Sequence, residues 1–259
     1  MQKRKTKIIV VINQKGGPGK TTVSFHLAHA GLKTAKSRVL CIDLDSQGNL
    51  SQYLTGDLNI KDQTVGGAGL LFERGGLVPM QTTSSQIDLL HGHKELDRYD
   101  ADPVAEERAY AGVNGEVSQL LRSLDYDYVV IDTPPAVGLR HLAPLCWADV
   151  AVIPMEPSVS GIAGFQDVLK ALEQVQNLNP SLRWFGLLNR ANSSVRSHKA
   201  KDEWVREQYG KKILATLYSR AAVADAMEES PAQPVWKRKG TNRELREQWH
   251  SLCSLVIDK

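Results

Sequence analysis

The sequence predicts an α/β fold: a doubly wound, mostly parallel sheet flanked by helices. Short runs of consecutive apolar residues recur along the chain, and such runs are typical of strands buried on both faces of a parallel sheet. Stretches of helical length separate most of these runs, which indicates repeated strand–helix–strand units. A glycine-rich loop also lies between the first apolar run and the first expected helix.

The expected strands are spaced so that most pairs leave room for a helix between them. The first reads IIVVI and leads directly into the glycine-rich loop. Its continuous apolar character favours a strand that is covered on both faces. The expected strands are 8–12, 38–43, 86–91, 128–132, 149–154, 184–189 and 213–218.

The expected helices lie between these strands. Gly112 and Gly115 weaken the middle of one of them, because glycine is a poor helix former. Thr241 is predicted to cap the last helix, with Glu244 completing a capping box. The segment 56–102 is rich in Gly, Thr, Ser and Asp, which favours loops that contact a partner. The expected helices are 20–34, a short helix within 45–54, 105–124, 161–177, 194–209, 220–227 and 244–257.

Length and composition favour one domain over the whole chain, 1–259. The chain is 42% hydrophobic and 24% charged, which suits a buried core. A basic arm, 1–6, precedes the first strand and is too short for a helix-turn-helix domain. The three cysteines are far apart in sequence, which argues against a disulfide framework and favours a reducing cytoplasm. No apolar run approaches the roughly 20 residues that cross a bilayer.

The glycine-rich loop, 15–22, reads KGGPGKTT and predicts a phosphate-binding site. Glycines allow backbone N–H groups to point at phosphate oxygens, and the start of the following helix adds positive potential. Lys20 supplies a point charge for the β- and γ-phosphates, and the Thr21 hydroxyl suits Mg²⁺. The standard pattern has a glycine where this chain has Gln14. A chance glycine-rich turn is the alternative, which the flanking strand and helix disfavour.

Four segments together resemble the ParA/MinD family of deviant Walker A ATPases, with the P-loop NTPase fold, closest to the ParA/Soj-type partition ATPases. The resemblance extends over roughly 7–192. The sequence QGN within the second segment favours the ParA-type branch over the MinD-type branch. The four segments are KGGPGKTT (15–22), CIDLDSQGN (41–49), VVIDTPP (129–135) and ADVAVIP (148–154).

The resemblance implies a role for each matched residue. Lys15 would be the signature lysine, which reaches the phosphates of the ATP bound to the partner subunit in an ATP-sandwiched homodimer. Together with Lys20 it would stabilise the charge on the transferring phosphoryl group. Asp45 would orient the attacking water. Mg²⁺ would be held by Thr21, Asp43 and Asp132, and ATP would be bound by Gly16, Gly17, Gly19, Lys20, Thr21, Thr22 and, on the adenine side, Asn189 and Arg190. An aspartate after a strand also suits a turn or cap, and Asn189 also suits a strand end.

Two departures from the family pattern bear on hydrolysis. Pro18 has no N–H, so one phosphate donor is lost from the loop, which we expect to slow hydrolysis without preventing binding. Ser46 replaces the usual proline, which either loosens the segment or lets the hydroxyl cap the next helix. The pair His91 and His93 resembles half a metal site, but no third ligand follows at a useful spacing, which favours a loop.

Basic residues cluster within 190–212 and 237–246, although the net charge is only +3. Such clusters suit the phosphate backbone of DNA, and a solvated helix face is the alternative. The resemblance implies nonspecific DNA binding by the ATP-bound dimer, with Arg196, Lys199 and Arg220 as candidate contacts.

The resulting hypothesis is a cytoplasmic, nucleoid-associated partition ATPase, which releases DNA when a ParB-like partner stimulates hydrolysis. The cargo is not specified by the sequence. The alternative is a membrane-recruited regulator of the MinD type, although the last helix is expected to pack on the domain and no membrane is expected as a partner. An electron-transfer or metal-carrier ATPase would need a pair of exposed cysteines, which Cys41, Cys146 and Cys253 do not suggest.

Overall fold

The computed structural model describes residues 6–73, 76–135 and 137–259. Over these residues one sheet of eight strands forms, in the order β3-β4-β2-β5-β1-β6-β7-β8. All neighbouring strands are parallel except β3, which runs antiparallel to β4. Apart from Thr6, the predicted basic arm lies outside the described residues. The strands are β1 (Lys7–Val11), β2 (Val39–Asp43), β3 (Met80–Gln81), β4 (Ile87–Leu90), β5 (Tyr128–Asp132), β6 (Val150–Met155), β7 (Arg183–Ala191) and β8 (Ile213–Tyr218).

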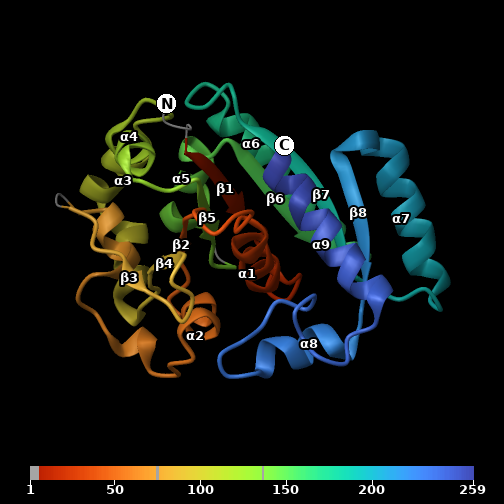
Figure 1. Ribbon diagram of the computed structural model, residues 1–259. Helices are drawn as coiled ribbons and strands as arrows, with labels where there is room; N and C mark the ends of the chain where they lie inside the picture. The colour runs from red at the N-terminus through yellow and green to blue at the C-terminus, as the bar shows by residue number, and fades with distance from the viewer. Residues whose placement is uncertain (1–5, 74–75, 136) are drawn as a thin grey trace.

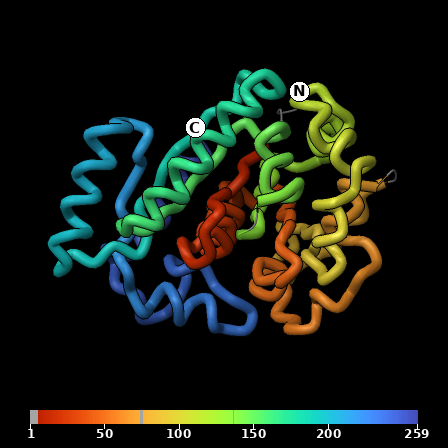
Figure 2. The backbone as a smooth tube through the Cα atoms, turned by 180° about the vertical axis from the view of Figure 1, so that it is seen from behind, coloured from red at the N-terminus to blue at the C-terminus, as the bar shows by residue number. Residues whose placement is uncertain are grey.

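Helices cover both faces of this sheet, as the doubly wound prediction requires. The helices α1, α2, α8 and α9 pack on the face seen in Figure 1. The view from behind in Figure 2 shows α5 and α6 across the opposite face, which α3, α4 and α7 also cover. The helices are α1 (Lys20–Ala30), α2 (Asn49–Thr55), α3 (Pro103–Ala109), α4 (Glu116–Ser123), α5 (Leu139–Trp147), α6 (Val159–Val175), α7 (Arg196–Tyr209), α8 (Ala221–Glu228) and α9 (Arg243–Asp258), and a 3-10 segment, η3, spans Lys94–Ala101.

The central strand β1 explains why the apolar run is continuous. Ile8 and Val10 point into the core on one face, whereas Ile9 and Val11 point into the core on the other. All four are fully buried. Successive side chains of a strand alternate between faces, so a strand covered on both sides has no polar position.

The predicted helix over 105–124 is wrong as a single element. The segment forms two helices, α3 and α4. Gly112 in the connection has a φ of 81°, which lies outside the range of a right-handed helix. The side chain of Asp102 caps α3 by accepting hydrogen bonds from two backbone N–H groups. Glycine adopts this left-handed conformation without steric cost, which explains the break.

The cap predicted for the last helix is also wrong by one residue. The side chain of Asn242, not Thr241, accepts a hydrogen bond from the N–H of Leu245 (2.8 Å). The Thr241 hydroxyl is buried and has no hydrogen-bond partner. Of the two alternatives for Ser46, the cap of α2 is not made, since Gly48 occupies the cap position and no side chain bonds there.

Helix α9 packs on the domain, as predicted. Leu245, Trp249, Leu252 and Val256 are at most 6% exposed, whereas Leu255 is 42% exposed. Lys7 anchors the end of the helix by donating to the carbonyl of Ile257 (2.7 Å). Within the described residues, no helix has both the length and the apolar composition needed to cross a membrane.

Candidate functional site

The site is built around the loop between β1 and α1. Gly17 and Gly19 have φ values of 96° and 88°, so both adopt the left-handed conformation that favours glycine. A Cβ on Gly19 would lie 2.3 Å from the Nδ2 atom of Asn189. That nitrogen donates to the carbonyl of Pro18 (2.8 Å), which ties the loop to β7. The loop therefore depends on glycine here, and Asn189 supports it.

Lys20 lies inside the loop at the start of α1. Its side chain is buried, with the whole residue 7% exposed, and its Nζ donates to the carbonyl of Lys15 (3.1 Å). Burial lowers the pKa of Lys20, and the nearby carboxylates Asp132 and Asp45 oppose this shift. A cation held out of water beside backbone N–H groups is suited to binding an anion.

Asp43 and Asp132 lie side by side at the carboxyl ends of β2 and β5. They are direct partners in the parallel pairing of these two strands. Both are buried, at 0% and 1% exposed. Burial raises the pKa of Asp43, and the nearby Asp132 adds to the shift. Burial also raises the pKa of Asp132, while the neighbouring Thr21, Lys20 and Ser24 side chains oppose the shift. Two adjacent buried carboxylates are costly unless a cation compensates them.

The hydrogen bonds around these carboxylates leave one oxygen available for a metal ion. Ser51 donates to Asp43 Oδ2 through its backbone N–H (2.9 Å) and its hydroxyl (2.7 Å). Ser24 donates to Asp132 Oδ1 (2.9 Å), whereas Asp132 Oδ2 is buried without a partner. Carboxylate and hydroxyl oxygens suit Mg²⁺, so the residues present fit that ion. Ser24 and Ser51 were missed by the sequence reasoning, because a serine alone carries no signal.

The segment after β4 supports the same carboxylates and does not assemble a metal site. The Gly92 N–H donates to the Ser51 hydroxyl (2.9 Å), and a Cβ on Gly92 would lie 2.3 Å from the backbone oxygen of Asp45. His91 bonds to the carbonyl of Gln63 (2.9 Å). No cluster of three or more His, Cys, Asp or Glu side chains that could hold a metal ion occurs among residues 6–73, 76–135 and 137–259. The loop interpretation of His91 and His93 is therefore the better one.

Lys15 is the first residue of the loop, and Asp45 lines the cavity beside it. Asp45 Oδ1 accepts the N–H of Gln47 (2.9 Å). Lys15 is exposed, and its backbone N–H donates to Asn13 Oδ1 (2.8 Å). The stem of Lys15 lies against α6, since a Cβ on Gly164 would be 2.6 Å from Lys15 Cγ. The exposed ammonium group is thus available to another molecule.

Two cavities adjoin the loop. One, of about 320 Å³, is lined by the residues 16–22 together with Asp45 and Arg190. The other, of about 400 Å³, shares Gly19, Thr22 and Arg190 with it and extends to Tyr218 and Trp249. Their combined shape suits the phosphates of a nucleotide in the first cavity and its base and ribose in the second.

The second cavity contains the predicted adenine-side residues. Asn189 lies within β7 and does not end the strand. Arg190 has a φ of 55° at an irregularity in the pairing of β7 with β8, which turns this residue toward the loop. Its Nη1 lies 3.4 Å from Glu156 Oε1. Asn189 and Arg190 are therefore brought together with the phosphate loop.

The candidate DNA contacts lie near the same end of the sheet. Arg196 and Lys199 are exposed on α7, at the edge of the molecule beside β8 in Figure 1. Arg220 is also exposed and lines the second cavity. Tyr218 lines both that cavity and a third, of about 230 Å³, to which Lys199 contributes. Arg220 is thus close to the nucleotide cavity as well as to solvent.

The three cysteines are free and buried: Cys41 on β2, Cys146 on α5 and Cys253 on α9. None is exposed for pairing across an interface. The structure therefore gives no support to the electron-transfer or metal-carrier alternative.

The fold and the site define a P-loop nucleotide-binding protein with a two-lysine loop. Residues 6–184 match the family described as AAA domain (AAA_31). The chromosome partitioning protein ParA of Myxococcus xanthus is 34% identical over 228 residues, which covers 83% of this chain and 75% of that protein. The chain therefore belongs to the ParA/MinD family of P-loop ATPases.

Solved structures agree with this fold. A putative plasmid partition protein from Borrelia burgdorferi bound to AMPPNP has a TM-score of 0.77 at 22% identity, over 98% of each chain. Cobyrinic acid a,c-diamide synthase from Mycobacterium smegmatis, with bound ADP and magnesium, has a TM-score of 0.66 at 26% identity, over 79% of this chain and 83% of that one.

Proposed function

We propose that this protein is an ATP-dependent partition ATPase, which uses ATP and Mg²⁺ to position a DNA molecule or another cargo. One observation carries the proposal: buried Lys20 lies in a glycine loop beside two buried carboxylates, and one carboxylate oxygen has no partner. The partition role is supported by the chromosome partitioning protein ParA and by the Borrelia plasmid partition protein described above.

The residues of the site divide the binding of phosphate, metal ion and base between them in this proposal. The amides of Gly17, Gly19 and the first turn of α1 donate to phosphate oxygens, and Lys20 places its charge against the β- and γ-phosphates. Thr21, Asp43 and Asp132 would hold Mg²⁺. When bound, the ion neutralises charge on the phosphates. Asn189 and Arg190 face the base and ribose.

Hydrolysis needs an oriented water and a stabilised transferring phosphoryl group. Asp45 accepts a hydrogen bond from the attacking water. This aligns the water for in-line attack on the phosphoryl group. Lys15 crosses to the nucleotide of a second copy of the chain and stabilises the charge that develops there. Its exposed ammonium group, with the stem fixed against Gly164, supports this role in trans.

The ATP-bound homodimer binds DNA without reading its sequence. Arg196, Lys199 and Arg220 contact phosphates, and their exposure at one end of the sheet supports a shared surface. A ParB-like partner stimulates hydrolysis and releases the dimer, so the protein would be cytoplasmic and associated with the nucleoid. Packing of α9 on the domain supports this proposal over the membrane-recruited alternative.

The test compares the two lysines of the loop. Lys20→Ala should weaken ATP binding strongly, because it removes the buried charge that faces the phosphates. Lys15→Ala should bind ATP as the wild type does but should not hydrolyse it, since its ammonium group acts only across the dimer. Equilibrium ATP binding and phosphate release measure the two effects separately. Normal hydrolysis by both variants would show that the site assignment is wrong.

A further inference from the structure

Arg140 is a buried arginine that contacts the backbone between Asp43 and Asp45, two proposed active-site aspartates. It lies in the first turn of α5, a few residues after Asp132, and is 3% exposed. Its Nη1 donates to the backbone carbonyl of Leu44 (3.0 Å). Leu44 is flanked in sequence by Asp43 and Asp45, so the contact is made to the backbone that carries both carboxylates.

The backbone at Leu44 is held from two directions. Its N–H donates to the carbonyl of Asp132 (2.9 Å), and its carbonyl accepts from Arg140. Together these bonds fix the peptide groups on either side of the Leu44 Cα, and they set the direction in which the Asp45 side chain leaves the chain. Without Arg140 the carbonyl would be buried and unpaired, which is unfavourable enough to reorient the peptide.

Arg140 is itself fixed by two carboxylates of η3. Asp100 accepts from the Arg140 backbone N–H (3.0 Å), from Nε (3.1 Å) and from Nη2 (2.7 Å). Asp97 also pairs with Nη2 (2.7 Å). Asp100 comes this close because Gly138 has no side chain: a Cβ there would lie 2.7 Å from Asp100 Cγ. The planar guanidinium group is thus locked in one orientation.

We infer that Arg140 is a positioning residue for ATP hydrolysis: it fixes the Leu44 backbone, and thereby Asp45, by joining the segments that follow β2 and β5 to η3. The inference rests on the proposed function, in which Asp45 aligns water. Arg140 does not line either nucleotide cavity, so it acts on the rate of hydrolysis and not on ATP binding.

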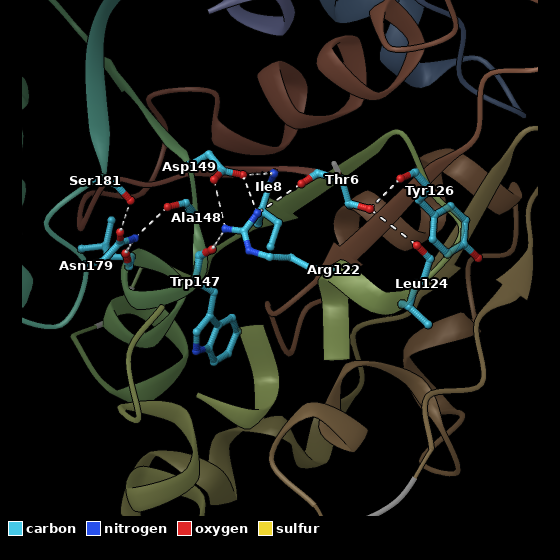
Figure 3. Close-up of polar contacts among 11 residues, drawn as sticks. Thr6, Ile8, Arg122, Leu124, Tyr126, Trp147, Ala148, Asp149, Asn179 and Ser181 are labelled. Atoms are coloured by element: carbon cyan, nitrogen blue, oxygen red, sulfur yellow. Dashed lines mark hydrogen bonds and ion pairs between the residues drawn. The ribbon is translucent and has the colours of Figure 1, made fainter. Parts of the chain in front are cut away.

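Arg122 provides a matched control at the opposite end of the sheet. It lies on α4 and pairs with both carboxylate oxygens of Asp149 (3.0 Å each), as Figure 3 shows. It also donates to the carbonyls of Thr6 (3.1 Å) and Trp147 (3.0 Å). These partners lie at the amino ends of β1 and β6, away from the phosphate loop. Removing Arg122 therefore disturbs a similar network without touching the site.

The experiment measures single-turnover hydrolysis of bound ATP, the Kd for a nonhydrolysable ATP analogue, and the urea midpoint for each variant. Arg140→Gln should slow hydrolysis by on the order of tenfold or more, because small misplacements of aligning groups cost this much. Its Kd should stay within about threefold of wild type. Arg140→Lys should recover part of the rate, since its ammonium group also donates to a carbonyl. Arg122→Gln should lower the urea midpoint but leave the rate within about twofold.

Asp45→Ala separates the inference from the proposed function. If Asp45→Ala hydrolyses ATP normally, the site assignment itself fails. If Asp45→Ala is inactive but Arg140→Gln keeps the wild-type rate, only the inference about Arg140 is overturned. The inference is also overturned if Arg122→Gln slows hydrolysis as much as Arg140→Gln does. Should Arg140→Gln not fold, Asp100→Asn serves instead, because it keeps one acceptor oxygen for Arg140, replaces the other with an NH2 donor and removes the charge. It should slow hydrolysis by about threefold or more, and a wild-type rate would overturn the inference.

Discussion

Acid should destabilise the fold through its buried histidines, and His26 on α1 allows the effect to be calculated. Its ring is fully buried, Nε2 accepts the N–H of Val235 (3.1 Å), and Nδ1 donates to the carbonyl of Thr22 (2.7 Å). Burial lowers the pKa of His26 from 6.5 to about 4, with the bond to Thr22 opposing the shift. Protonation would place a second N–H against that of Val235, so the charged ring loses this bond.

The direction in which stability changes with pH depends on whether the folded or the unfolded chain binds more protons. Between pH 6.5 and about 4 the unfolded chain carries a proton on His26 that the folded chain does not, so stability falls as the pH falls through this window. Each pKa unit corresponds to about 1.4 kcal/mol. The full contribution is therefore about 3 kcal/mol, of which about 2 kcal/mol is lost by pH 5. Burial likewise lowers the pKa values of His29, to about 3, and His141, to about 4, which adds to the acid effect.

Urea unfolding of the wild type and of His26→Gln at pH 7 and pH 5 measures this contribution. The glutamine amide keeps a donor and an acceptor but does not titrate. The stability difference between the two proteins should shrink by about 2 kcal/mol from pH 7 to pH 5. Leu27→Ala, on the same helix and equally buried, should carry the same penalty at both pH values. An unchanged difference between wild type and His26→Gln would contradict a lowered His26 pKa in the folded protein.

Further predictions concern the aspartates, the caps and the metal ion. Gly92→Ala should slow single-turnover hydrolysis by on the order of tenfold while the fold persists by circular dichroism, because the new Cβ would meet the Asp45 backbone oxygen at 2.3 Å; a wild-type rate would contradict the role of this contact. Asn242→Ala should cost about 1 kcal/mol in urea unfolding, whereas Thr241→Val should cost less, because the Thr241 hydroxyl has no partner. Equal losses would contradict the cap assignment. Removing Mg²⁺ with EDTA should abolish hydrolysis and lower the thermal midpoint measured with ATP present, since two buried carboxylates are left uncompensated; unchanged hydrolysis would contradict the metal assignment.

The parallel sheet was predictable because its strands are buried on both faces, and burial leaves a continuous apolar run. β1 and β5 illustrate this, since each follows its predicted run to within a residue. The two-residue strand β3 was missed, because it is too short to show a pattern and is paired only along β4. Helix α5 was missed as well: Pro144 lies inside it and argues against a helix in a local reading.

The residues proposed to bind nucleotide and metal were predictable from the sequence, whereas the residues that hold them in position were not. Lys20, Asp43 and Asp132 belong to recognisable segments, and the structure brings them together at the carboxyl edge of the sheet. Ser51, Gly92 and Arg140 act through contacts between segments that are far apart in sequence. A single serine, glycine or arginine has no pattern of its own, so only the folded chain shows these roles.

Binding to a random-sequence DNA duplex at one fixed salt concentration, with ATP and Mg²⁺ compared with ADP and Mg²⁺, decides whether ATP controls a DNA-bound state. We expect binding at least about tenfold tighter with ATP, weakened by Arg220→Ala and by Arg196→Ala with Lys199→Ala. Lys170→Ala, which removes an exposed lysine from α6, should leave binding unchanged. Equal affinity in both nucleotide states, or no binding in either, would contradict the proposal that ATP controls a DNA-bound state.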